Sequence, residues 1–245
     1  MSMSTRRLFA ILAMLLGSTV AKVSVAQQAE SGTVVRDPAS DELLTPENSA
    51  LIIIDYQPLA VNSVQSRDRQ QLVDNIVRVA RTARLYGLPI IVSTTGVTTS
   101  GNAPTIPELQ AVLGGINAID RTTLNAWEDP RFVAAVRATH RRKLIMTGLW
   151  TEVCLTFPAL DALREGYEVY PVIDAVGGTS VEANQAGLDR IEQAGGHPTT
   201  WVQLISELQR DVSRQSTMQG FMSILFDPSL PFVRASRQGQ GGGGR

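Results

Sequence analysis

The feature that most constrains the fold is a series of short apolar runs that alternate with stretches of helical periodicity. Residues 50–54 read ALIII, residues 88–95 read LPIIVSTT and residues 143–148 read KLIMTG. Short runs that are apolar and rich in β-branched residues are typical of strands buried on both faces of a parallel sheet. Two further strands are predicted over 167–175 and 199–202.

Helical periodicity fills the intervals between these strands. Helices are predicted over 68–86, 105–113, 130–139, 152–165, 181–194 and 203–213. Strand–helix–strand crossovers are right-handed and cover a parallel sheet on both faces. We therefore predict an α/β fold, a three-layer, doubly wound and mostly parallel sheet with helices on both faces. Ligands of such sheets bind beyond the carboxyl ends of the strands, so the functional residues are expected there.

The N-terminal 26 residues have the composition of a cleaved export signal. Arg6 and Arg7 precede an apolar run over 8–21, and a small-residue cleavage site precedes Gln27. The run is shorter than the roughly 20 residues that a membrane span needs. Residues 5–9 (TRRLF) also resemble a twin-arginine signal, although paired arginines occur in ordinary signals too. We expect a periplasmic protein whose mature form has no membrane segment.

The remaining chain divides into three parts. Residues 27–46 are polar and aperiodic and are predicted to be a flexible lead-in, residues 47–230 form one domain, and the glycine-rich residues 231–245 are predicted to be disordered. Removal of residues 1–26 takes away three cations and changes the formal charge from −1 to −4. A mildly acidic body without a basic stripe argues against a nucleic-acid partner.

The only cysteine, Cys154, lies where the predicted strand 143–148 gives way to a helix. In an exported protein a lone cysteine cannot form an intramolecular disulfide. If Thr151 caps the helix, the thiol lies in its first turn, where backbone N–H groups lower a thiol pKa from about 8.5 to roughly 3.5–7.5. The same N–H groups can hold an oxyanion. The alternative is a small buried residue with no chemical role.

Two charged residues lie in the same part of the predicted sheet. Asp55 directly follows the run Ile52–Ile54 at the end of a strand, either as a cap of the next loop or as a base for the thiol. Arg121 lies in an irregular segment between the second and third strands, and most arginines in such segments are solvated surface charges. Position alone leaves both alternatives open.

Other common kinds of site are not indicated. His140 and His197 are the only histidines, and neither has a triad-like setting. The chain has no metal-ligand spacing, no dinucleotide fingerprint after a strand and no phosphate-binding lysine loop. We therefore expect no metal and no cofactor.

Three segments resemble the isochorismatase-like cysteine hydrolases. They are LIIIDYQ (51–57), INAIDRTTLNAWEDPRFVAAVRAT (116–139) and LIMTGLWTEVCLTFPALDALREGYEVYPVIDA (144–175). The arginine before NAW, and TEVC followed by FPAL, resemble the YcaC-like subgroup in particular. Carried over by motif, the resemblance implies that Asp55 is the acid, that Cys154 is the nucleophile and that Arg121 stands where the family usually has lysine.

The resemblance also implies a mechanism. Asp55 takes the thiol proton, Cys154 attacks a small amide-like C–N substrate to form a thioester, and backbone N–H groups near Val153 and Cys154 hold the oxyanion. A non-proline cis peptide is expected at Trp150–Thr151, and a homo-oligomer acting on a small molecule is expected from the family's habits. Oxyanion or substrate contacts are expected from Thr151, Val153, Trp150, Gln57, Asn125 and Trp127.

Arg121 departs from the family pattern. Lysine can lose a proton, whereas arginine stays charged and grips carboxylates in a fixed fork, so Arg121 can hold charge but cannot shuttle protons. The substrate then differs from those of the lysine enzymes, or activity is weak. Two other classes of function stay open, a thiol-based oxidant sensor and a periplasmic binding protein.

Overall fold

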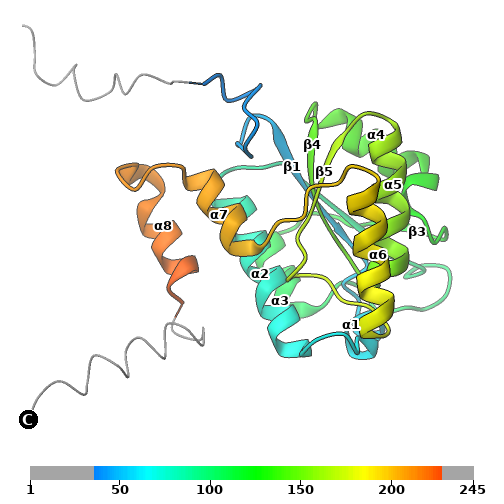
Figure 1. Ribbon diagram of the computed structural model, residues 1–245. Helices are drawn as coiled ribbons and strands as arrows, with labels where there is room; N and C mark the ends of the chain where they lie inside the picture. Colours follow the sequence, from blue (N-terminus) through cyan, green and yellow to red (C-terminus); the bar gives the residue numbers. More distant parts are fainter. Residues whose placement is uncertain (1–35, 228–245) are drawn as a thin grey trace, which may run out of the picture. The chain divides into compact units, whose positions relative to one another are not determined.

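The structure is a computed structural model in which residues 36–227 are described (Figure 1). Its centre is a five-stranded sheet of order β3-β2-β1-β4-β5, in which every neighbouring pair is parallel. The strands are β1 (Ser49–Ile54), β2 (Ile90–Thr95), β3 (Ile119–Arg121), β4 (Lys143–Gly148) and β5 (Glu168–Pro171). The predicted α/β fold with a parallel sheet is confirmed.

Helices cover both faces of this sheet. They are α1 (Pro58–Ser63), α2 (Arg69–Leu85), α3 (Pro107–Leu113), α4 (Pro130–Ala138), α5 (Thr156–Arg164), α6 (Val181–Gln193), α7 (Trp201–Gln209) and α8 (Gln215–Leu225). Two short turns complete the described elements, the 3-10 turn η2 (Ala126–Glu128) and the π-helical turn η3 (Thr151–Leu155).

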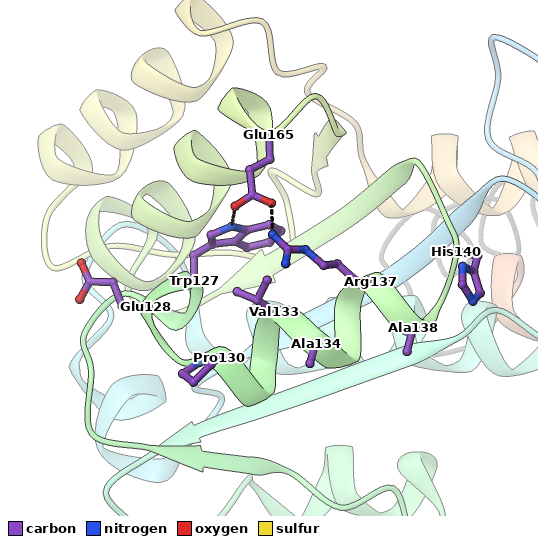
Figure 2. Close-up of a pocket in the computed structure, with 9 residues that line it drawn as sticks. All are labelled: Trp127, Glu128, Pro130, Val133, Ala134, Arg137, Ala138, His140 and Glu165. Carbon is purple, nitrogen blue, oxygen red and sulfur yellow. Dashed lines mark hydrogen bonds and ion pairs between the residues drawn. The ribbon is translucent and has the colours of Figure 1, made fainter.

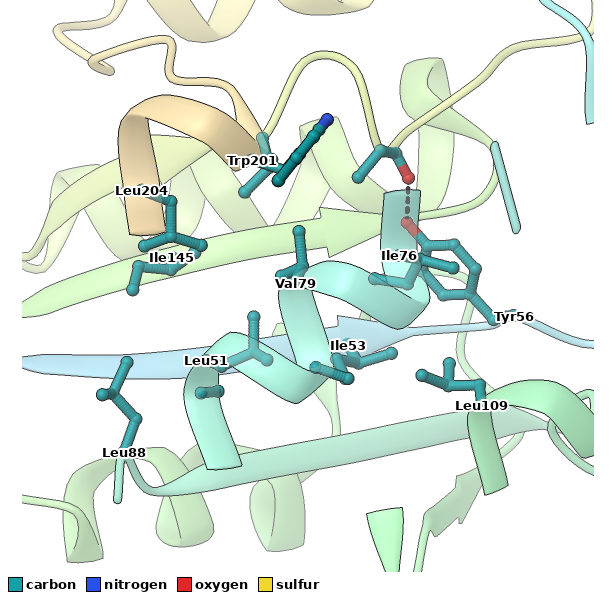
Figure 3. Packing of buried hydrophobic residues seen from close by; sticks show 14 of the residues in the cluster. Leu51, Ile53, Tyr56, Ile76, Val79, Leu88, Leu109, Ile145, Trp201 and Leu204 are labelled. Atoms are coloured by element: carbon teal, nitrogen blue, oxygen red, sulfur yellow. Dashed lines mark hydrogen bonds between the residues drawn. The ribbon is translucent and has the colours of Figure 1, made fainter. Parts of the chain in front are cut away.

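The two faces of β1 enter two separate hydrophobic clusters. Leu51 and Ile53 pack against α2, α3 and α7 (Figure 3), whereas Ile52 and Ile54 pack against α4 and α5. Successive side chains of a strand point to opposite faces, so a strand covered on both sides must be apolar at every position. This is why the ALIII segment shows no alternation.

Six elements differ from those predicted. Residues 199–202 are not a strand, because Thr199 makes only a single bridge to Val172 and Thr200 caps α7 by accepting a hydrogen bond from the Gln203 N–H. The strand predicted over 167–175 ends at Pro171. The short elements β3, α1 and α8 were not predicted, and the helix predicted over 152–165 is divided into η3 and α5.

Part of the predicted lead-in, residues 36–46, is described, and it is bonded to the domain, whereas residues 27–35 lie outside the described residues. The Leu44 side chain is fully buried, and its N–H donates to Glu207 Oε2 at 2.8 Å. The Lys143 ammonium donates to the Glu42 carbonyl, and Asp41 pairs with Arg210 at 3.2 Å. The polar residues of this segment therefore attach it to the domain from about residue 41 onward.

The export signal and the glycine-rich tail lie outside the described residues. Between residues 36 and 227, no helix has both the length and the apolarity needed to cross a bilayer.

Candidate active site

The strand order brings Asp55 and Arg121 to the same edge of the sheet. Asp55 directly follows β1, and Arg121 is the last residue of β3, paired in register with Thr95 of β2. The irregular setting expected for Arg121 is therefore wrong. A short edge strand carries it, and its side chain spans β2 to reach the end of β1.

Arg121 and Asp55 form a buried, two-pronged ion pair. Arg121 Nη1 donates to Asp55 Oδ1 at 2.7 Å, and Nη2 donates to Oδ2 at 2.7 Å. The side chains are 0% and 5% exposed respectively. The Thr95 hydroxyl donates to Asp55 Oδ1 at 3.0 Å. Charge-assisted bonds of this geometry fix the orientation of the carboxylate as well as its charge.

The backbone turns sharply as it leaves β1. Asp55 has a φ of 60°, in the left-handed region that non-glycine residues rarely adopt. The Arg121 guanidinium also donates to the carbonyls of Thr94 at 3.1 Å and Leu124 at 3.2 Å. The ion pair is thus anchored to three segments of the chain, and these anchors hold a strained residue in place.

Cys154 enters the site from the turn η3, after β4 ends at Gly148. A Cβ on Gly148 would lie 3.2 Å from the Cys154 carbonyl, so a larger residue there would require the turn to shift slightly. The peptide bond Leu149–Trp150 is cis, one bond earlier than predicted. Single π-helical turns are often found at functional sites.

The thiol of Cys154 lies within the influence of both charged partners. The residue is 9% exposed. Burial raises the pKa of the thiol, the charge of Asp55 and a hydrogen bond with it raise the pKa further, and the Arg121 cation opposes them. The lowered pKa expected from a helix N-terminus is wrong, because burial and the carboxylate outweigh the turn. Burial and the Asp55 carboxylate therefore favour the protonated form of the thiol.

The backbone donors of η3 are largely used within the fold. The N–H groups of Val153 and Cys154 both donate to the Trp150 carbonyl, at 3.1 and 2.9 Å, and that of Thr151 donates to the Gly177 carbonyl at 3.0 Å. Thr151 does not cap the helix, since its hydroxyl donates to Asn184 Oδ1 at 2.8 Å. Among the described residues no acceptor faces the Trp150 N–H, which follows the cis bond.

Two amide side chains expected near substrate instead brace the site. Gln57 Nε2 donates to the carbonyls of Thr95 and Ala103 at 3.2 and 2.8 Å, and its Oε1 accepts from the Thr95 N–H at 2.9 Å. Asn125 Nδ2 donates to Asp161 Oδ2 at 2.7 Å, and Asn125 Oδ1 caps η2. Both amides are committed to intramolecular bonds that fix the segments after β1 and β3.

Trp127 belongs to a different hollow. Its indole N–H donates to Glu165 Oε1 at 2.8 Å, and Arg137 pairs with the other oxygen of the same carboxylate (Figure 2). These residues line a cavity of about 800 Å³ on the outer side of α4, and Cys154 is not part of that lining. The indole of Trp150 packs on the α2 side of the sheet and donates to the Ser63 hydroxyl at 2.8 Å.

Sequence reasoning did not single out two residues that shape the site, Thr95 and Glu152. Thr95 was placed at the end of a strand, but its contact with Asp55 follows only from the register of β1 and β2. Glu152 lies beside Cys154 in the chain, and its contacts to the loop after β5 are invisible in a single sequence. Within residues 36–227, no three His, Cys, Asp or Glu side chains gather in a way that could hold a metal ion.

Comparison with known proteins gives consistent matches. Residues 49–203 match the model of the isochorismatase domain. The probable hydrolase YcaC of Escherichia coli is 34% identical over 192 residues, which are 78% of this chain and 90% of that protein. Isochorismatase domain-containing protein 2A of Mus musculus is 30% identical over 175 residues, which are 69% of this chain and 79% of that protein.

Solved structures give the same result. YcaC from Pseudomonas aeruginosa, with hexane-2,5-diol and covalent acrylamide, superposes with a TM-score of 0.75 at 32% identity, over 82% of this chain and 98% of that one. YcaC from Escherichia coli, described as an octameric hydrolase of unknown specificity, has a TM-score of 0.75 at 31% identity, over 82% and 97% of the two chains.

Proposed function

Because the chain belongs to the isochorismatase family of hydrolases, we propose that it hydrolyses a small amide-like C–N bond with Cys154 as the nucleophile. The observation that carries this proposal is the buried Asp55–Arg121 pair at the carboxyl edge of the sheet, both of whose charges act on the pKa of the chain's only thiol. The Pseudomonas aeruginosa relative carries covalent acrylamide, a small electrophile, which supports a reactive nucleophile in this fold.

The mechanism begins with a protonated thiol. Asp55 accepts the thiol proton as the sulfur attacks the carbonyl carbon, and the C=O electron pair moves to oxygen. The C–N bond then breaks, the nitrogen leaves with the proton from Asp55, and a thioester remains on Cys154. Water adds to the thioester with loss of a proton to Asp55, and the C–S bond breaks to release the acid and restore the thiol.

Arg121 acts in this scheme through its charge alone. It stays protonated throughout, so it holds Asp55 in register with the sulfur and lowers the energy of the transient thiolate. The raised pKa of Cys154 means that the proton moves when a substrate carbonyl is present rather than beforehand. We assign the developing oxyanion first to the Trp150 N–H, because the N–H groups of Val153 and Cys154 are bonded to the Trp150 carbonyl.

The test is intact-protein mass spectrometry with a panel of small amides and nitriles. We expect an acyl or thioimidate adduct on Cys154 and release of the amine, and neither in Cys154→Ala. Amine release that persists in Cys154→Ala would contradict the proposal. A reversible sulfenic acid without any acyl adduct would favour an oxidant sensor, which the buried, protonated thiol argues against. A binding protein would keep its ligand affinity in Cys154→Ala.

We further propose that the protein is exported to the periplasm and acts there as a homo-oligomer. The arginine-started apolar leader supports export, and the octameric Escherichia coli relative supports assembly. N-terminal sequencing of the periplasmic fraction tests the first point, with Gln27 as the expected first residue. Replacement of Arg6 and Arg7 by lysine separates the two routes, because a twin-arginine signal loses export and an ordinary signal keeps it.

A further inference from the structure

Glu152 ties the turn that carries Cys154 to the loop that follows β5. Its Oε1 accepts two hydrogen bonds from one residue, at 3.0 Å from the Thr179 N–H and at 2.6 Å from the Thr179 hydroxyl. Beside this contact, the Thr151 N–H donates to the Gly177 carbonyl at 3.0 Å. The nucleophile turn is therefore bonded to the loop 177–179 by backbone and by side chain.

Two glycines make this docking possible. A Cβ on Gly178 would lie 2.5 Å from Glu152 Oε2, and a Cβ on Gly187 of α6 would lie 2.9 Å from Glu152 Cα and 2.9 Å from Thr156 Oγ1. Real Cβ atoms do not approach other atoms this closely without displacement. Because Gly178 and Gly187 lack side chains, there is space between them for the backbone and the carboxylate of Glu152.

In this arrangement the second oxygen of Glu152 is left without a donor from the described residues. Oε2 is buried and, among the described residues, has no hydrogen-bond partner. A carboxylate oxygen that gives up water without gaining a donor costs free energy, and such groups in native structures call for an explanation. A role of Glu152 in positioning the thiol of Cys154 would explain why this oxygen is left unpaired.

We propose that Glu152 is a positioning residue that keeps the Cys154 sulfur in register with Asp55 through its hydrogen bonds to Thr179. This rests on the proposed nucleophilic role of Cys154. Only Val153 lies between Glu152 and Cys154 in a tight turn, so release of Glu152 from Thr179 lets the turn move and carries the sulfur away from its proton acceptor. What matters is an acceptor atom of the right reach rather than negative charge.

Substitutions at Glu152 and Thr179 distinguish the effect of the Glu152 hydrogen-bond acceptor from the effect of its negative charge. Glu152→Gln keeps an oxygen at the same reach, whereas Glu152→Met keeps the length of the side chain without an acceptor. Thr179→Val removes one of the two donors, and Thr179→Ser restores it. Glu182→Met is the matched control, because Glu182 is an exposed glutamate in the first turn of α6.

Two experiments use the full mature chain. The first measures kcat and KM with the best small amide. The second measures the rate at which acrylamide modifies Cys154 as a function of pH. For Glu152→Met we expect a fall of about 10- to 100-fold in kcat and in the modification rate, with KM little changed. Glu152→Gln and Thr179→Ser stay within about threefold of the wild type, and Glu182→Met is unchanged. The double variant Glu152→Met/Thr179→Val is no worse than Glu152→Met alone, because the two side chains act as one contact.

Three results would overturn the proposal. They are wild-type rates in Glu152→Met, equal losses in Glu152→Gln and Glu152→Met, and additive losses in the double variant. The modification rate needs no turnover, so it reports on the position of the sulfur even if no amide proves to be a substrate. Turnover that depends on Cys154 but not on Glu152 would refute the positioning role and leave the proposed function intact.

Discussion

Both terminal nitrogens of Arg121 donate hydrogen bonds to the Asp55 carboxylate, and they also donate to two backbone carbonyls. These bonds hold the positive charge of the guanidinium at one position in the site. A lysine at this position offers a single nitrogen and cannot form two parallel bonds to one carboxylate. Arginine therefore cannot transfer a proton as lysine can, but it holds the carboxylate in a more rigid orientation. In the scheme above the proton moves only between sulfur, Asp55 and substrate, and a rigid cation is compatible with every step.

Arg121→Lys is expected to weaken this pair without removing its charge. Loss of one charge-assisted bond should lower the free energy of unfolding by about 1–3 kcal/mol, and Cys154 modification should slow because the carboxylate is less fixed. Urea unfolding and intact mass spectrometry measure the two effects. Arg137→Lys is the control, since Arg137 pairs with Glu165 at the surface and its change should cost under about 1 kcal/mol. Equal effects of the two substitutions would contradict a special role for the buried pair.

The raised pKa of the Cys154 thiol predicts a specific pH dependence of stability. Below an ordinary thiol pKa of about 8.5 the thiol is protonated in both the folded and unfolded states. Above it the unfolded chain loses the proton and the folded chain keeps it, so the free energy of unfolding falls by up to about 1.4 kcal/mol per pH unit. Unfolding of the wild type and of Cys154→Ser is compared between pH 7 and 10.5. The difference in the free energy of unfolding between the two proteins should be constant below about pH 8.5. Above that pH the wild type should lose stability relative to Cys154→Ser. A difference that stays constant up to pH 10.5 would contradict the raised pKa.

The elements around the site show which parts of the fold a sequence can reveal. The carboxyl ends of β1, β2 and β4 were predicted correctly because each strand contains an apolar run of at least three residues, and β1 and β4 are buried at every position. The strand β3 has only three residues, one of them Asp120 and one Arg121, so no hydrophobic pattern marks it. What makes it a strand is its pairing with β2, which is a tertiary contact.

The site itself was predicted in part. The meeting of Asp55, Arg121 and Cys154 followed from the motifs and from the edge where parallel strands end. The raised pKa of Cys154 was not predictable, because the sequence gives neither the burial of the thiol nor the effect of the Asp55 charge on it. The roles of Gln57 and Asn125 in bracing the site depend on hydrogen-bond partners 36 to 46 residues away.

The substitution Gly187→Ala tests how closely α6 must pack against the turn that carries Cys154. Alanine is a better helix former than glycine by about 1 kcal/mol, so propensity alone predicts that Gly187→Ala stabilises α6. Its Cβ would lie 2.9 Å from Glu152 Cα, and we expect this overlap to prevail, with a loss of about 1–3 kcal/mol and slower modification of Cys154. Thermal unfolding and intact mass spectrometry measure both effects. Gln185→Ala, at an exposed position of the same helix, should be neutral or slightly stabilising; a stabilised Gly187→Ala variant would contradict the close packing.

For the whole molecule, the distribution of exposed apolar side chains bears on how copies of the chain associate. Leu59 in α1, Leu124 after β3 and Val181 at the start of α6 are 70%, 65% and 61% exposed. All three follow the carboxyl ends of strands, the edge that also carries Asp55, Arg121 and Cys154. We take these side chains as candidates for the contact in the proposed homo-oligomer, because exposed apolar surface favours association and the Escherichia coli relative is an octamer.

Leu124 is the best position at which to test association through this edge. Its carbonyl accepts from Arg121 Nη2 at 3.2 Å while its side chain points into solvent, so a substitution changes the surface and leaves the backbone bond available. We expect the mature protein to be a homo-oligomer by native mass spectrometry and Leu124→Asp to dissociate it, because a carboxylate cannot be buried there unpaired. Val212→Asp is the comparison, since Val212 is 78% exposed but lies between α7 and α8. If Val212→Asp dissociates the oligomer and Leu124→Asp does not, the copies associate through the α7–α8 side, and the candidate site opens to solvent rather than toward a neighbouring copy.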